Sequence, residues 1–277
     1  MKKLFISLIV LVAASTVWAQ TVLTIASVNN PNMEDMQELS SAFTDANPDI
    51  ALEWLFLDEG TLRSRLQTEV ATGGGSFDLV TVGAYETPLW AANDWIVSID
   101  GLAEANPEAA EGYDFDDILA PVRDMNSYNG ELYAVPFYAE SSFTMYNKRI
   151  LDEAGFTMPD APTWQEVADI ACAVHDPDNG IYGIALRGKP GWGDAMAPIT
   201  TVVNTFGGQW FDEEGRPQLD SPEWNEAVTF YADIANRCGP PGLTGNSFNE
   251  SRQLMENGQA AIWVDATVAA GIMASSP

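Results

Sequence analysis

The stretch from Asn129 to Asn147 constrains the fold more than any other part of the chain. It opens on Asn129-Gly130 between two extended runs, and this pair predicts a hairpin turn because both residues tolerate a positive φ. The aromatic and β-branched residues that follow predict a strand, but Pro136 lacks a backbone N–H and cannot lie in the middle of a sheet. We therefore expect one strand to leave a sheet at Pro136 and another to begin at Phe143, with a single carboxylate, Glu140, between them.

The chain before this stretch alternates between strand and helix patterns. Strands are predicted at Thr21–Val28, Ile50–Leu57 and Phe77–Val82. We expect the first helix to have Asn32 as its N-cap and a face made of Met36, Leu39 and Phe43, and the second to carry Leu62, Leu66 and Val70. This alternation is typical of a doubly wound parallel sheet, whose ligands bind beyond the carboxyl ends of the strands. Asn30 and the run from Gly83 to Glu86 follow two such ends.

Between these strands and the stretch from Asn129, at Trp90 to Asp124, we expect only a short helix and acidic loops, around Glu104 to Asp117.

The chain after Asn147 predicts a second α/β unit. Beyond residue 138, a capping box at Thr163 and the pair Ser221-Pro222 each predict the start of a helix. Further helices are predicted at Lys148–Ala154, Ala195–Thr205 and Glu250–Glu256, and strands at Ile181–Leu186 and Ala260–Asp265. The sequence thus predicts a first lobe over residues 20–137 and a second over 138–277, without an internal repeat.

The first residues have the composition of a signal peptide. Lys2 and Lys3 precede an apolar run from Leu4 to Ala14, and Val17-Trp18-Ala19 resembles a cleavage site with small residues. The apolar run is too short to span a membrane, which argues against an anchor. We expect residues 1–19 to be removed near Ala19 and the protein to be periplasmic.

Charge and rare residues exclude several function classes. The net charge is −28, and removal of Lys2 and Lys3 takes it to −30, so we expect no binding to nucleic acid or to anionic lipid. Cys172 and Cys238 are the only cysteines, and in an oxidising compartment they form either a disulfide, which we favour, or two buried thiols. Because the chain has two cysteines and a single histidine, His175, we expect no zinc site of protein ligands and predict no metal site.

Four motifs in order carry a resemblance to a known family. They are "GELYAVPF…E…MYNK", "AGFTMPDAPTWQEV", "RGKPGWGDAMAPITTVVNTFGGQWFD" and "AAIWVDATVAAG". Together they resemble the periplasmic solute-binding proteins of sugar ABC transporters (extracellular solute-binding family 1), and the last two resemble its sorbitol/mannitol, or polyol, branch. The resemblance covers about Val22 to Gly271. It implies a type II two-lobed fold with the ligand in the cleft between the lobes, a permease as partner and, we expect, a monomer. Members of this family are longer, so it also implies a chain truncated at its C-terminus with an incomplete first lobe.

The chemistry of a polyol selects the candidate binding residues. Carboxylates accept hydrogen bonds from hydroxyls, amides and arginines donate to them, and an aromatic face packs on the C–H side. The candidates are Asn30, Tyr85, Glu86, Glu140, Arg187, Trp192 and Asp265. The resemblance places ligand contacts at Glu140 and Trp192, and Trp192 lies in a glycine-rich loop typical of a ligand edge rather than of a core.

Each of the other candidates also has a structural interpretation. Asn30 could serve turn chemistry, Tyr85 edge packing and Glu86 a helix cap, while Arg187 could be a surface charge and Asp265 a strand-end turn residue.

The alternatives to a polyol receptor are a receptor for a mono- or disaccharide and a secreted carbohydrate-active enzyme. Related maltodextrin-binding proteins stack sugar on an aromatic residue where Val268 stands here, so a small ligand is expected. A hydrolase of the serine or cysteine type needs a base, and His175 lies in a turn motif without a nucleophile near it. We therefore expect a binding protein rather than an enzyme. No cofactor is expected either, since this interpretation implies none.

Overall fold

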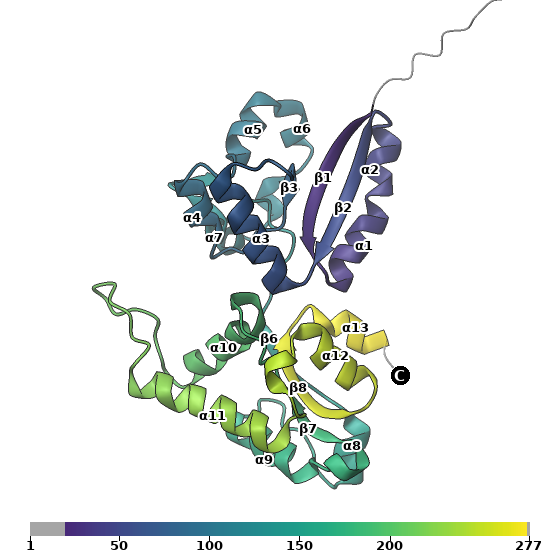
Figure 1. Ribbon diagram of the computed structural model, residues 1–277, viewed down its shortest axis with the longest axis vertical. Helices are drawn as coiled ribbons and strands as arrows, with labels where there is room; N and C mark the ends of the chain where they lie inside the picture. Colours follow the sequence, from purple (N-terminus) through teal and green to yellow (C-terminus); the bar gives the residue numbers. More distant parts are fainter. Residues whose placement is uncertain (1–19, 276–277) are drawn as a thin grey trace, which may run out of the picture.

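The computed structural model describes residues 20–275 of the chain. The expected signal peptide and its cleavage near Ala19 lie outside these residues. The described part forms two bodies joined by a thin connection, which we call the crossing segment (residues 133–141) (Figure 1). We call residues 20–132 the first lobe and residues 142–275 the second lobe.

The sheet of the first lobe is parallel and has the order β2-β1-β3. It consists of β1 (Thr21–Val28), β2 (Ile50–Leu57) and β3 (Leu79–Val80), and Ile25 on β1 is in register with Trp54 on one side and Leu79 on the other. The expected strand–helix alternation is confirmed, although the third strand is shorter than Phe77–Val82. Helix α3 (Glu59–Thr72) packs on the sheet through Leu62 and Leu66, which are fully buried.

The first helical segment differs from the prediction. It consists of α1 (Pro31–Leu39) and α2 (Ser41–Ala46), and the N-cap is Asn30 rather than Asn32, because the side chain of Asn30 accepts a hydrogen bond from Met33 N at 2.9 Å. Leu39 and Phe43 are exposed, Met36 is half-buried and Met33 is buried, so the expected apolar face of Met36, Leu39 and Phe43 was wrong.

The acidic stretch that we expected to be loops is largely helical. It contains α4 (Thr87–Ala92), α5 (Ile99–Ala105), α6 (Pro107–Glu111), a 3-10 turn η1 (Phe115–Asp117) and α7 (Ala120–Met125). The prediction failed because charge alone does not exclude a helix when capping residues are present: Ser98 caps α5 through Gly101 N. The hairpin β4 (Ser127–Tyr128) and β5 (Glu131–Leu132) then turns at Asn129-Gly130, and both turn residues have a positive φ, as predicted. The second strand of this hairpin ends at Leu132 and does not continue to Pro136.

The sheet of the second lobe is mixed and has β8 at its centre. Its order is β6-β8-β7, with β6 (Ser142–Tyr146) antiparallel and β7 (Tyr182–Ala185) parallel to β8 (Ala260–Ala266). Every residue of β8 from Ala260 to Asp265 is buried, because helices cover the strand. Val80 and Ile184 belong to separate sheets, so no strand pairing joins the two lobes within the described residues.

Helices whose starts the sequence predicts build the core of the second lobe. The capping box at Thr163 starts α9 (Trp164–Val174), and Ser221 caps α11 (Pro222–Cys238) with Pro222 in its first turn. Ile170 of α9 and Ile234 of α11 pack with Ile184 and Ile262 of the sheet, and each such burial stabilises the fold by roughly 1.5–3 kcal/mol. The remaining elements are α8 (Lys148–Glu153), η2 (Pro177–Asn179), the π-helical turn η3 (Trp192–Met196), α10 (Ala197–Thr205), η4 (Leu243–Gly245), α12 (Phe248–Glu256) and α13 (Ala269–Ser275).

A disulfide fastens two of these helices to each other. Cys172 near the end of α9 is bonded to Cys238 at the end of α11, with their Cα atoms 4.9 Å apart. The strand β7 passes beside both helices, and a side chain at Gly183 would collide with the backbone carbonyl of Ala171. The bond therefore links positions 66 residues apart in sequence, at a place where α9, α11 and β7 pack closely. No helix within residues 20–275 is long and apolar enough to cross a membrane.

Loss of this disulfide should destabilise the second lobe. Closure of a loop of this length stabilises a protein by about 2–4 kcal/mol, so the free energy of unfolding of Cys172→Ala/Cys238→Ala in urea should fall by that amount. Unfolding of the wild type in the presence of a reductant is the control, because it removes the cross-link without removing side-chain atoms. If the reduced wild type unfolds at the same urea concentration as the oxidised protein, the bond does not contribute to stability.

Candidate functional site

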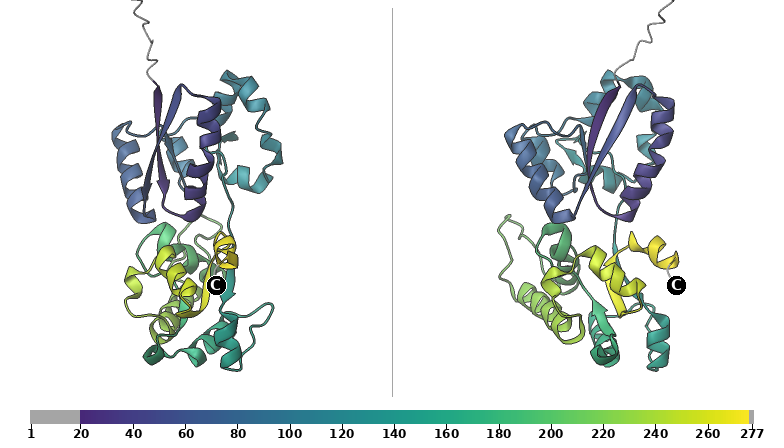
Figure 2. Two further views of the ribbon diagram at one scale, coloured as in Figure 1. Left: turned by 90° about the vertical axis from the view of Figure 1, so that its right-hand side faces the viewer. Right: turned by 45° about the vertical axis from the view of Figure 1, so that its right-hand side comes forward.

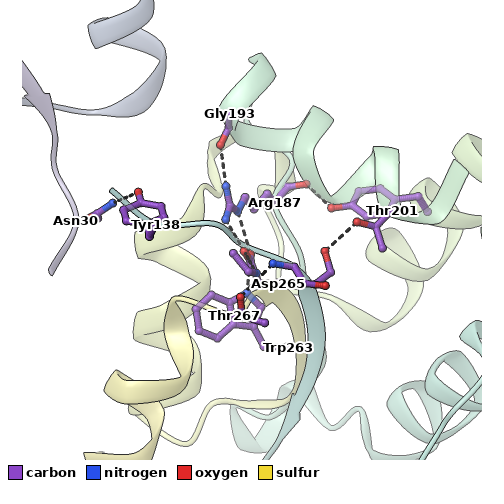
Figure 3. A network of polar contacts seen from close by, with 12 residues as sticks. Asn30, Tyr138, Arg187, Gly193, Thr201, Trp263, Asp265 and Thr267 are labelled. Carbon is purple, nitrogen blue, oxygen red and sulfur yellow. Dashed lines mark hydrogen bonds and ion pairs between the residues drawn. The ribbon is translucent and has the colours of Figure 1, made fainter. Parts of the chain in front are cut away.

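The crossing segment is held by hydrogen bonds to both lobes. On the side of the first lobe, Asn30 Nδ2 donates to Tyr138 Oη at 3.1 Å. On the side of the second lobe, Ser141 N donates to Thr267 Oγ1 at 3.1 Å, and Thr267 N donates to the carbonyl of Ser141 at 2.8 Å (Figure 3). Figure 2 shows the crossing segment passing between the two lobes. Glu140 lies between these two attachments along the chain, which places it at the junction of the lobes.

A buried ion pair lies beside this attachment in the second lobe. Arg187, just after β7, donates from Nε to Asp265 Oδ2 at 2.9 Å, and its Nη2 forms a shorter contact to Asp265 Oδ1 (Figure 3). Trp263 Nε1 and Ala266 N also donate to this carboxylate, so four donors surround Asp265. The side chains of Arg187 and Asp265 are 9% and 2% exposed, which excludes a surface charge and a solvated turn residue as their roles.

The guanidinium of Arg187 is fixed on all sides. Its Nη1 donates to the carbonyl of Gly193 at 2.7 Å, and its Cζ lies 5.1 Å from the ring centroid of Phe248. The backbone carbonyl of Arg187 accepts from Tyr231 Oη. Burial is the largest single effect and acts to lower the pKa of Arg187, but the attraction and hydrogen bond of Asp265, together with the charges of Glu140 and Asp194, outweigh it and leave the pKa above its ordinary value. Arg187 is therefore a permanent cation in a rigid frame.

Glu140 has a raised pKa although its side chain remains accessible. The main cause is desolvation by the surrounding protein, to which the negative charges of Asp265 and Glu59 add. Arg187 and a hydrogen bond from the backbone of Val268 act in the opposite direction. The carboxylate is thus in water on one side and enclosed on the other, where additional hydrogen-bond donors would stabilise its ionised form.

Two aromatic side chains meet across the junction. Tyr85 of the first lobe and Trp192 of the second lobe have ring centroids 4.5 Å apart, and both rings remain about two-fifths exposed. Trp192 also contacts Trp210, with ring centroids 5.7 Å apart. The glycine-rich loop expected to form a ligand edge therefore presents an indole face at the lobe junction.

Glu86 lies beside Tyr85, but its carboxylate is already bound within the first lobe. Its carboxylate accepts a hydrogen bond from Gly83 N at 3.1 Å and forms an ion pair with Arg63 Nη1 at 3.0 Å. Arg63 also bonds to Glu59 and to the carbonyl of Thr81. The structure thus brings the candidates to the junction, where the carboxylate of Glu86 is already engaged by Arg63 and by Gly83 N in the first turn after β3. Glu86 precedes α4, but its side chain makes no capping hydrogen bond there.

Sequence reasoning missed several polar residues at the junction. Lys189 Nζ of the second lobe lies 2.9 Å from Asp58 Oδ1 of the first lobe, and Asp58 also caps α3 through Thr61 N. Asp58 directly follows β2, so the strand-end rule that selected Asn30 could have found it. Asp194, in η3, is buried at the same place, and nothing in the sequence distinguishes it from a surface acid.

Two surface hollows differ in their position relative to this junction. One, of about 630 Å³, lies at the rim of the junction and is lined by Asp58, Gly60, Thr61, Ser64, Arg65, Lys189 and Pro190. The other, of about 640 Å³, lies between α9 and α11 and contains none of the candidates. Among the described residues there is no cluster of three or more side chains that could hold a metal ion. The junction therefore combines carboxylate acceptors, a fixed cation and an aromatic face, which suits an uncharged ligand rich in hydroxyls.

Comparison with known proteins identifies the family of the chain. The family model described as "Bacterial extracellular solute-binding protein" matches residues 29–276. The chain belongs to this family. It is 49% identical over 247 residues to the mannitol-binding protein of Pseudomonas aeruginosa, an alignment that covers 89% of this chain and 55% of the relative. The chain therefore spans about half the length of this curated relative.

Solved structures of family members share the fold. A solute-binding protein of an ABC transporter from Agrobacterium vitis, solved with bound D-mannitol, is 45% identical with a TM-score of 0.84, covering 91% of this chain and 59% of that one. A solute-binding protein from Agrobacterium radiobacter in complex with ribitol is 27% identical with a TM-score of 0.82, covering 92% and 63%. The two-lobed type II fold expected from the sequence is confirmed, as is the resemblance to the polyol branch.

Removal of Asp265 should leave Arg187 as an uncompensated buried cation. We expect Asp265→Ala to lower the free energy of unfolding by about 3–5 kcal/mol, as for other broken buried ion pairs. The matched control is Asp233→Ala, which breaks an exposed pair with Arg237 on α11 and should cost less than about 1 kcal/mol. Chemical unfolding of both variants measures the difference, and equal losses would contradict the role given to the buried pair.

Proposed function

We propose that this chain is the substrate-binding component of an ABC transporter and that it binds a linear polyol of the mannitol or sorbitol type. The observation that carries the proposal is the grouping of Glu140, Arg187 and Trp192 at one lobe junction, in a chain 49% identical to a mannitol-binding protein. We also propose the lobe boundary at residues 137/138, a monomeric state, removal of the leader near Ala19, a periplasmic location and delivery to a membrane permease.

In this mechanism the ligand stabilises the closed arrangement of the lobes. Glu140 accepts hydrogen bonds from ligand hydroxyls, which compensates its desolvation, and the indole face of Trp192 covers C–H groups. Arg187 has five N–H donors, and its contacts to Asp265 and Gly193 leave some of them for ligand oxygens. Asp265 contributes by fixing Arg187 rather than by contacting the ligand. Ligand contacts made only when the lobes are together shift the equilibrium towards closure.

The environment of His175 favours binding over catalysis. Its Nδ1 accepts a hydrogen bond from Gly183 N at 3.2 Å, so this ring nitrogen already binds the backbone of β7. The family relatives named above bind substrates for transport, and we propose that this chain likewise performs no chemistry. A receptor for a mono- or disaccharide is the alternative outcome of the binding test.

Two substitutions test the ligand contacts directly. Glu140→Gln replaces an acceptor oxygen by a donor, and loss of a hydrogen bond to a charged group, about 1.5–3 kcal/mol, should weaken mannitol binding about ten- to a hundredfold. Trp192→Ala should weaken binding of all alditols alike, because it removes the apolar face. Glu213→Gln and Phe211→Ala, both exposed and outside the junction, are the matched controls. Calorimetry with mannitol, sorbitol, ribitol and maltose measures each affinity.

Unchanged affinity in both Glu140→Gln and Trp192→Ala would show that the ligand site lies elsewhere. If the wild type binds maltose more tightly than every alditol, the ligand is a disaccharide and not a polyol.

The contribution of Glu140 should depend on pH. The ionised carboxylate accepts the ligand hydroxyls, so ligand binding lowers a pKa that desolvation raises in the free protein. The advantage of the wild type over Glu140→Gln is therefore fully present above this raised pKa and is lost as the pH falls through it. Calorimetric titrations of both proteins from pH 8 to about pH 4 measure the ratio of affinities, and a ratio independent of pH would contradict the role of the charge.

A further inference from the structure

Asp194 is a buried carboxylate at the contact between the lobes. It belongs to η3 of the second lobe, which packs on the first turn of α3 of the first lobe. The residue is 2% exposed, and within the described part of the chain its Oδ2 has no hydrogen-bond partner. A Cβ placed on Gly60 in that first turn would lie 3.6 Å from this oxygen. A Cβ on Gly191 of its own lobe would lie 3.3 Å from the same oxygen, so the oxygen is enclosed between its own loop and the first turn of α3 in the opposite lobe.

The charged groups around Asp194 compensate its burial only in part, because the attraction of the nearby cations is smaller than the cost of desolvation and no group donates a hydrogen bond to its buried oxygen within the described residues. Lys189 and Arg187 are the nearby cations, but Lys189 is paired with Asp58, and Arg187 with Asp265. From the first lobe, Glu59 and Asp58 face it with negative charge. The N-terminus of α3 would attract an anion, yet Asp58 already caps it by accepting from Thr61 N. Closure thus brings a third carboxylate to a helix end that is already capped.

We propose that Asp194 opposes closure of the two lobes and thereby sets the ligand affinity and the ease of ligand release. When the lobes separate, the carboxylate regains water; when they close, it is desolvated without a partner, which costs free energy. The closed state is consequently less populated in the ligand-free protein, and the apparent affinity falls by the same fraction. The part of this inference that concerns ligand affinity rests on the proposed function, whereas the part that concerns closure does not.

The pH dependence follows from the same burial. Desolvation in the closed state raises the pKa of Asp194; Glu59 and Asp58 add to this effect, and Lys189 and Arg187 oppose it. In the open state the group is solvated and titrates nearer its ordinary value. Since the closed state then binds the proton more tightly, closure becomes more favourable as the pH falls from above the raised pKa towards the ordinary one.

The variant Asp194→Asn removes the charge and keeps the shape. Without ligand, its radius of gyration from small-angle X-ray scattering at neutral pH should be smaller than that of the wild type. Its affinity for mannitol by calorimetry should be higher, by about three- to tenfold, because less free energy opposes closure. Asp178→Asn, an exposed acid in the turn η2, is the control and should change neither quantity. Near-ultraviolet circular dichroism and thermal unfolding establish that both variants are folded.

A second measurement uses the wild type alone, so it does not depend on the folding of the variant. Its ligand-free radius of gyration should decrease between pH 8 and about pH 4, and Asp194→Asn should lose this decrease. An unchanged radius in both experiments, or a lower mannitol affinity of Asp194→Asn, would overturn the inference. If the wild type binds no polyol, the proposed function fails, and the scattering data still decide whether Asp194 opposes closure.

Discussion

The ion pair between Arg187 and Asp265 organises the junction of this protein. It joins the end of β7 to the end of β8, and through Gly193 it also fixes the turn η3 that carries Trp192. Two charges taken out of water are costly unless their remaining hydrogen-bonding capacity is used. Here Trp263 and Ala266 satisfy the carboxylate, and Tyr231 holds the backbone of Arg187. The position of each group offered to a ligand by the second lobe depends on this pair.

Local rules predicted most elements of the fold because the determinants are short-range. The turn at Asn129-Gly130 requires positive φ, and the capping residues Thr163 and Ser221 satisfy backbone donors a few residues away. The same reasoning failed where two local solutions competed. Both Asn30 and Asn32 have side chains that can cap a helix. Asn30 is the cap because β1 ends at Val28 and the helix begins soon after it, at Pro31. The acidic stretch before residue 117 was misjudged because its charges lie on exposed faces of short helices, where they cost little.

The candidate site was predicted only as a set of residue types. Glu140 and Trp192 came from the family resemblance, and the chemistry of hydroxyl groups suggested the rest. The partners of these residues were not predictable, since Arg187 and Asp265 are 78 positions apart and Lys189 and Asp58 are 131 apart. Glu86 illustrates the limit: its sequence neighbours suggest a ligand edge, yet Arg63, on α3, binds its carboxylate. Long-range pairing decides which polar groups remain available, and short-range patterns do not contain it.

The disulfide between Cys172 and Cys238 has a consequence beyond resistance to unfolding. It joins α9 to α11, which both pack against β7, and the backbone of α9 approaches β7 closely at Gly183. The second lobe is therefore cross-linked within itself, whereas the crossing segment is joined to the first lobe by the hydrogen bond that Asn30 donates to Tyr138. Under the proposed function, a ligand that brings the lobes together then has few additional degrees of freedom to order within the second lobe. Much of the conformational entropy that a looser receptor would lose at each binding event is lost here once, when the chain folds and oxidises.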